Sequence, residues 1–82
     1  MAIYKIPLVL TPQPEGGFTV TSPLLPELVT EGDSVDEVLE NVKDALRAVW
    51  ELYEESGNPL PPDLVQDATA APVSFELVID AA

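Results

Sequence analysis

The sequence contains neither cysteine nor histidine. Without cysteine, a disulfide framework or a cysteine-based zinc site is excluded. Without histidine, the chain lacks the commonest general base and the usual partner of a nucleophilic serine. Its four serines, Ser22, Ser34, Ser56 and Ser74, therefore have no imidazole to activate them. We expect no catalytic, cofactor-binding or metal-binding residues, and hence no enzyme.

Basic residues are scarce: three Lys and Arg stand against 15 Asp and Glu, which gives a formal net charge of −12. Nucleic-acid binding depends on the neutralisation of phosphates by Lys and Arg, so we expect no direct contact with nucleic acid. A surface of this charge accelerates encounter with a basic protein partner. The alternative is that the charge serves solubility alone.

Long apolar runs are also absent. None approaches the 18–20 or so residues of a membrane span, and residues 1–5 are too short and interrupted for a signal peptide. We therefore expect a soluble, cytoplasmic protein without membrane contact. Its 82 residues suit one domain, residues 1–82, with a thin core of Val, Leu and Ile because aromatics are few. Oligomerisation often supplies what such a core lacks.

Three strands are predicted before any helix. Residues 2–10 form the first, with Tyr4, Ile6, Leu8 and Leu10 on its better core face, and Pro7 implies an edge position. Turn residues follow at 11–17, where Gly16 and Gly17 can adopt positive φ. Residues 18–21 alternate as a second strand and complete a hairpin. Residues 27–31 are the third.

A long helix begins at Val35. Ser34 and Glu37 form a capping box, and the acidic first turn complements the helix dipole. Gly57 and Pro59 end the helix. One apolar face follows the helical period; its residues are Val35, Val38, Leu39, Val42, Ala45, Leu46, Val49 and Tyr53.

The rest of the chain supplies a connection and a final strand. Residues 59–71 form a connection long enough to be functional or mobile, with Leu60, Leu64 and Val65 as packing points. Residues 73–80 alternate as a strand with one wet face. The order strand–strand–strand–helix–strand (βββαβ) predicts an α+β fold with the helix on one face of the sheet.

The segment from Tyr4 to Ser56 resembles the HicB family of antitoxins. The resemblance rests on the order of an apolar strand, the 14–20 turn and strand (PEGGFTV), a Leu25-Pro26 corner, the 29–34 cap (VTEGDS) and the amphipathic helix. Glu27-Leu28 replaces the family's Gly-Cys corner. We expect no helix-turn-helix or ribbon-helix-helix segment of the kind that many members carry after the last strand, so the resemblance implies partner binding and not operator binding.

The resemblance implies a reduced RNase H fold and a small, basic, mRNA-cleaving HicA-like toxin as partner. A two-metal nuclease needs carboxylates converging from several strands. The first strand, residues 2–10, has none, so the nuclease residue set is absent.

The candidate partner-binding residues lie on the helix: Glu40, Asp44, Arg47, Trp50, Glu51 and Glu54. The acidic ones could form a docking strip for a basic toxin. They could equally be a solvated face with pairs such as Glu40–Lys43 and Arg47–Glu51. Trp50 could be an interface anchor or part of the core, whereas Tyr53 is expected in the core.

Two hypotheses of function remain, and a third is catalysis by carboxylates and a divalent ion. The first is an antitoxin that covers the RNA-binding and catalytic surface of its toxin. The second is an orphan structural or regulatory module without a toxin. A homo-oligomer, dimer or tetramer, is expected in either case.

Overall fold

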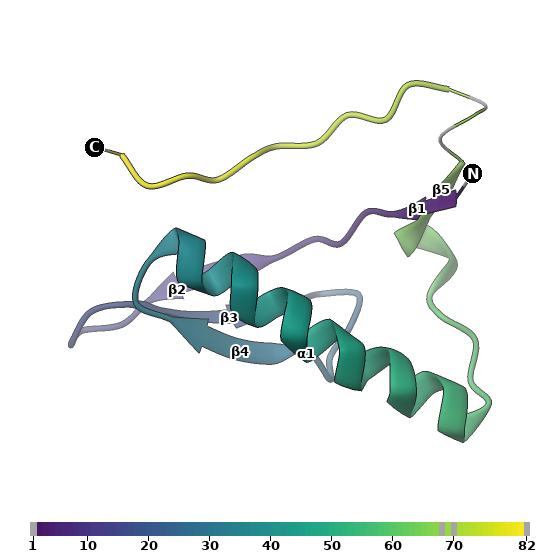
Figure 1. The fold of residues 1–82 in the computed structure, drawn as a ribbon, viewed down its shortest axis with the longest axis horizontal. Coiled ribbons are helices and arrows are strands. Elements are labelled where there is room, and N and C mark those ends of the chain that lie inside the picture. The colour runs from purple at the N-terminus through teal and green to yellow at the C-terminus, as the bar shows by residue number, and fades with distance from the viewer. Residues whose placement is uncertain (1, 68, 70, 82) are drawn as a thin grey trace.

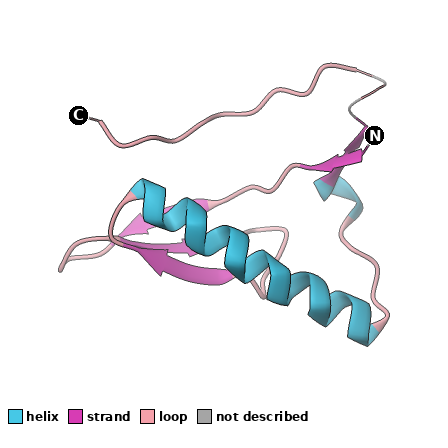
Figure 2. Cartoon of the chain, viewed as in Figure 1, coloured by secondary structure: helices cyan, strands magenta, loops and turns pink. Residues whose placement is uncertain are grey.

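A computed structural model describes residues 2–67, 69 and 71–81 (Figure 1). Strands β2 (Val9–Pro12), β3 (Phe18–Thr21) and β4 (Val29–Gly32) form an antiparallel sheet in that order. The helix α1 (Val35–Ser56) lies across this sheet, while β1 (Ala2–Tyr4) and β5 (Val65–Asp67) pair with each other away from it (Figure 2). The predicted α+β class is confirmed; the RNase H-like arrangement stays a prediction.

The prediction of one continuous strand over residues 2–10 is wrong. It divides into β1 and β2, and residues 5–8 belong to neither. The β2–β3 ladder pairs Val9 with Thr21, and Gln13 N–H donates to the Gly17 carbonyl. In the same alternation, Pro7 lies opposite Pro23 at the next position where two residues would exchange backbone hydrogen bonds. Neither proline has an N–H to donate, so the ladder ends at Val9.

The second strand is where the sequence predicted it, at Phe18–Thr21. The third, predicted over residues 27–31, begins two residues later and ends one residue later, at Val29–Gly32. Gly16 and Gly17 both adopt positive φ in the turn of the hairpin, as expected. The Leu25–Leu28 corner is a turn in which Leu28 N–H donates to the Leu25 carbonyl at 2.9 Å. Among the described residues only glycines have positive φ, so Glu27 fits this corner without strain.

The helix begins and ends at the predicted residues. Ser34 Oγ accepts from Glu37 N–H at 3.2 Å, and Gly57 adopts the left-handed conformation at the C-terminal end. A second backbone donor at this end of the helix is also bonded: Val35 N–H donates to the Asp80 carboxylate, at 3.2 and 3.3 Å from its two oxygens. Asp80 therefore joins the C-terminal part of the chain to the positive end of α1.

The core lies between α1 and the sheet. Val38, Val42 and Val49 of the helix are buried, as predicted for its apolar face. The other buried residues of the core come from β3, the Leu25–Leu28 corner and the 59–71 connection; they are Val20, Leu25, Leu28 and Leu64. The core is small and aliphatic, as the composition indicated.

Part of the 59–71 connection is packed rather than loose. Leu64 ends a single 3₁₀ turn, Pro62–Leu64, and is fully buried. The Leu64 carbonyl accepts from Lys5 N–H at 2.7 Å, directly before the β1–β5 ladder. Of the other predicted packing points, Leu60 is half-buried but Val65 is exposed.

The final strand lies elsewhere than predicted. It is β5, Val65–Asp67, whereas residues 73–80 run as an extended chain with no strand partner (Figure 1). Alternation in a sequence specifies which side chains share a face, but a strand also needs a neighbour for its backbone hydrogen bonds. Within the described residues that neighbour is missing for 73–80.

Candidate protein-binding surface

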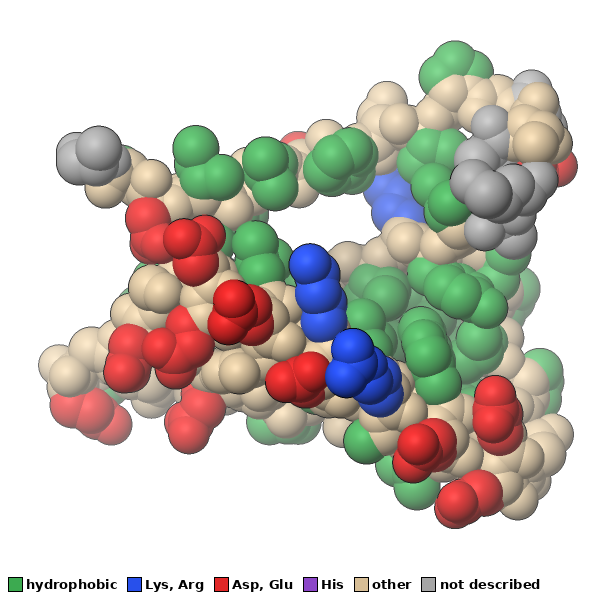
Figure 3. All heavy atoms as spheres, viewed as in Figure 1, with side chains coloured by type: hydrophobic (Ala, Val, Ile, Leu, Met, Phe, Trp, Pro, Cys, Tyr) green, Lys and Arg blue, Asp and Glu red, His purple; other side chains and the backbone are tan. Residues whose placement is uncertain are grey.

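Five of the six predicted partner-binding residues form one exposed row on α1. Glu40, Asp44, Arg47, Glu51 and Glu54 are all exposed. Their spacing of four, three, four and three residues keeps them on one side of the helix, because successive residues are about 100° apart. We call these five residues the acidic stripe. Figure 3 shows acidic side chains along the face of α1 that looks away from the sheet, with basic ones among them.

The ion pairing within the stripe differs from the prediction. Arg47 lies 3.5 Å from Asp44, and not beside Glu51 as expected. Both side chains are about three-quarters exposed or more, at 80% and 74%. An exposed pair of this kind adds little to stability. The ion pair leaves the side chains of the stripe exposed to solvent.

Trp50 is set apart from the stripe. It is half-buried against the core, and its ring centroid lies 5.2 Å from that of Tyr4 with a 45° tilt. An aromatic pair at this distance contributes beyond its burial alone. Trp50 thus joins the last turns of α1 to β1, which favours its interpretation as a core residue.

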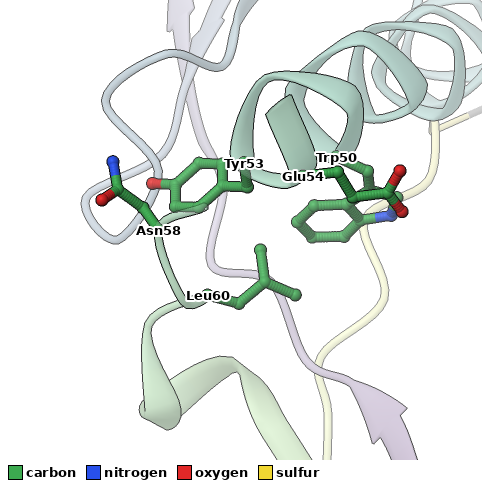
Figure 4. Close-up of a pocket in the computed structure, with 5 residues that line it drawn as sticks. All are labelled: Trp50, Tyr53, Glu54, Asn58 and Leu60. Carbon is green, nitrogen blue, oxygen red and sulfur yellow. The ribbon is translucent and has the colours of Figure 1, made fainter. Parts of the chain in front are cut away.

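A small hollow lies beside Trp50 at the end of α1. It is lined by Trp50, Tyr53, Glu54, Asn58 and Leu60 and has a volume of about 130 Å³ (Figure 4). Pockets for small molecules usually measure about 300–1,000 Å³. The hollow is too small for a cofactor. The rings of Trp50 and Tyr53 line it together with Glu54, the last residue of the stripe.

Tyr53 is held by a polar contact as well as by packing. It packs against the core, as predicted, and its hydroxyl donates to the Glu27 carboxylate at 3.1 Å. Desolvation, followed by the hydrogen bond and the negative charge of Glu27, raises the pKa of Tyr53 above 10.0. The contact links the C-terminal half of α1 to the Leu25–Leu28 corner.

The geometry gives no sign of a metal centre. Within residues 2–67, 69 and 71–81, no three acidic side chains gather in a group that could hold an ion. In the same part of the chain, no helix has both the length and the apolar character needed to cross a membrane.

The comparisons with known proteins agree on one family. No family model matches, but the chain is 40% identical over 72 residues to Antitoxin HicB 1 of Photorhabdus laumondii, covering 85% of this chain and 46% of the relative. It is 42% identical over 57 residues to Antitoxin HicB of Escherichia coli K12, covering 70% and 41%. A UPF0150 protein of Thermoplasma acidophilum is 31% identical over 65 residues, covering 79% of this chain and 94% of that protein. The chain belongs to the HicB-like antitoxin family. It spans less than half the length of the HicB antitoxins that it matches.

Three residues that position this HicB-like surface were not predicted to do so: Gly32, Tyr4 and Asp80. Gly32, where an added Cβ atom would stand 2.7 Å from the Val38 amide nitrogen, had a signal in the sequence, because glycine permits a close approach of two backbone segments. Tyr4 and Asp80 had none, since their contacts with Trp50 and Val35 span 46 and 45 residues of sequence. Such contacts arise only when the chain has folded.

Proposed function

We propose that the chain is the toxin-binding part of an antitoxin, and that the acidic stripe of α1 docks on a small, basic, mRNA-cleaving HicA-like toxin. The observation that carries this proposal is the row of four exposed carboxylates on one rigid helix. A surface that binds RNA must present cations to phosphate, so an acidic helix complements it. Docking there would deny RNA access to the toxin. The names of the relatives support the antitoxin role.

The mode of action in this proposal is occlusion without bond-breaking. A chain with no histidine and no cysteine has few routes to acid–base or nucleophilic catalysis. The net charge of −12 opposes direct binding to nucleic acid. Both properties suit a protein that covers another protein in the cytoplasm, where an mRNA-cleaving toxin acts.

The test is binding to a HicA-like toxin, encoded beside this chain, by isothermal titration calorimetry. The stripe variant carries Glu40→Gln, Glu51→Gln and Glu54→Gln, which leaves the Asp44–Arg47 pair intact. Its affinity is expected to fall at least about tenfold, or about 1.4 kcal/mol, and its binding to depend less on salt.

The matched control removes the same charge elsewhere, with Glu15→Gln, Glu31→Gln and Asp63→Asn, three exposed residues outside α1. We expect its affinity to stay within about twofold of the unaltered chain. Equal losses in both variants would mean that net charge, and not the stripe, attracts the toxin. No binding to any such toxin would refute the proposal.

A second candidate function is a regulatory or structural oligomer without a toxin. It is favoured by the exposed apolar side chains near the C-terminal end, Phe75, Leu77, Val78 and Ile79. Toxin titration separates the two candidates, because only the first requires binding.

A further inference from the structure

Two adjoining hollows meet at Tyr53, near the C-terminal end of α1. The first is the hollow of about 130 Å³ described above; the second measures about 270 Å³ and is lined by Glu27, Leu52, Tyr53, Ser56 and Asn58. Because Tyr53 and Asn58 line both, the two hollows form one surface groove, which we call the Tyr53 groove. Each hollow is smaller than a usual small-molecule pocket, so the groove fits a side chain of another protein better than a free ligand.

The walls of the Tyr53 groove are largely apolar. Trp50 and Tyr53 contribute aromatic rings from positions one turn apart on α1, and Leu60 lies across the first hollow from them (Figure 4). Leu52 lines the second hollow and is 52% exposed. The faces of Trp and Tyr rings attract a cation within about 6 Å of the ring centroid. These walls therefore suit a group that is positively charged and also packs against apolar surface.

The charge at the groove is negative. Its lining contains the carboxylates of Glu27 and Glu54 and no Lys or Arg. Glu27 accepts a hydrogen bond from the Tyr53 hydroxyl, which is a neutral donor. Arg47, the cation that precedes the groove on α1, is paired with Asp44. In the part of the chain that the structure describes, the two carboxylates of the groove thus have no cationic partner.

The end of α1 adds to this negative charge. A helix carries a partial negative charge at its C-terminal end, where cations stabilise it and carboxylates do not. The last two turns of α1 nevertheless contain Glu51, Glu54 and Glu55, and the last turn has no basic residue. Departures from a local preference of this kind are expected at functional sites. The arrangement favours a cation that another molecule supplies.

We propose that the Tyr53 groove receives an arginine side chain of a basic partner protein, with the guanidinium stacked on an aromatic ring and its N–H groups donating to a carboxylate of the groove. Arginine fits better than lysine because its planar guanidinium stacks on rings and donates two parallel hydrogen bonds to a carboxylate. Glu54 also belongs to the acidic stripe, so a partner on the stripe reaches the groove. The inference rests on the proposed function, to which it adds a site for one kind of side chain.

A titration with small peptides tests the groove in the absence of a toxin. The probe is a capped tripeptide with arginine between two glycines, and the signal is the fluorescence of Trp50, the only tryptophan of the chain. We expect it to bind at least about fivefold more tightly than the same peptide with lysine, and the peptide with uncharged citrulline not to bind measurably. Equal affinities for the arginine and lysine peptides would mean that the net charge of −12 attracts any cation, and would overturn the proposal.

Asn58→Phe fills the groove without changing the charge of the chain, because Asn58 is exposed and lines both hollows. We expect the affinity for the arginine peptide, and for the toxin, to fall at least about fivefold. The matched control is Thr21→Phe, at an exposed position of β3, and its affinities should stay within about twofold. Circular dichroism verifies that both variants fold.

The outcomes separate this inference from the proposed function. A toxin that binds Asn58→Phe as tightly as the unaltered chain, but binds the stripe variant weakly, would refute the groove and leave the proposed function standing. If no toxin binds, while the arginine peptide binds with the expected preference and Asn58→Phe weakens it, the groove is supported and the proposed function fails.

A purely structural role of Glu54 is tested by Glu54→Gln. Because this change removes a negative charge from the negative end of α1, the midpoint of thermal unfolding of the free chain should rise by about 1–8 °C. The affinity for the arginine peptide should nevertheless fall. Lower stability together with lower affinity would mean that Glu54 holds the fold rather than the arginine, and would contradict the inference.

Discussion

Gly32 lies directly beneath the first turns of α1. A Cβ atom on Gly32 would stand 2.7 Å from the Val38 amide nitrogen and 2.9 Å from Val38 Cγ2. The close approach of β4 and α1, which sets the position of the acidic stripe relative to the sheet, therefore depends on the missing side chain.

Gly32→Ala is expected to lower the free energy of unfolding by about 1–3 kcal/mol, because backbone atoms must move to admit the methyl group. Urea denaturation followed by circular dichroism measures this. Val29→Thr, on the same strand at a position 61% exposed, should change stability by less than about 0.5 kcal/mol. A Gly32→Ala chain as stable as the control would show that the helix can shift freely.

Ser34→Ala should cost about 1 kcal/mol, since Ser34 Oγ accepts the Glu37 N–H at the start of α1. Ser34→Asp should retain most of the stability, because aspartate also caps helices. Thermal denaturation of the three chains provides the measurement. An aspartate variant as unstable as the alanine variant would contradict capping.

Ser22→Ala is not expected to lower the free energy of unfolding, in contrast to Ser34→Ala. The Ser22 hydroxyl is buried and has no hydrogen-bond partner among the described residues. Its removal leaves no unsatisfied group behind, so stability should be unchanged or rise by up to about 1 kcal/mol. Comparison with Ser34→Ala by the same thermal denaturation isolates the effect of the hydrogen-bond partner. A loss similar to that of Ser34→Ala would indicate a buried water on Ser22.

Leu64→Ala should cost about 2–5 kcal/mol because the side chain is fully buried at the base of the connection. Leu52→Ala removes the same atoms from a side chain that is 52% exposed, and its cost should be much smaller. Chemical denaturation of both chains distinguishes a packed connection from a loose one. Equal costs would mean that residues 59–71 do not contribute to the core.

The Tyr53–Glu27 contact predicts a dependence of stability on alkaline pH. The pKa of Tyr53 is raised in the folded chain, so the folded state holds the phenolic proton more tightly than the unfolded state. This contribution is complete below the ordinary pKa of 10.0 and is lost as pH rises through the raised value. Tyr53→Phe should therefore flatten the fall of unfolding free energy above about pH 10. The measurement is urea denaturation across this range; identical slopes in both chains would refute it.

The local features of this protein were available from its sequence. The boundaries of α1 followed from Ser34 and Gly57, because capping depends on residues a few positions apart. The acidic stripe followed from spacing alone, since a helix converts a spacing of three or four residues into a shared face. The resemblance to the HicB family rested on the same short-range order of motifs, and the relatives bear it out.

Pairing between distant segments was decided only by the tertiary structure. Residues 73–80 alternate more regularly than Val65–Asp67, yet Val65–Asp67 is paired, because Leu64 is buried beside Lys5 and aligns the segment after it with β1. Likewise the β2–β3 ladder ends at Val9 because Pro7 would meet Pro23 at the next hydrogen-bonding position, a coincidence of register that neither proline reveals by itself. Periodicity determines which side chains face together, but the partner of a strand depends on which backbone groups the rest of the fold leaves free.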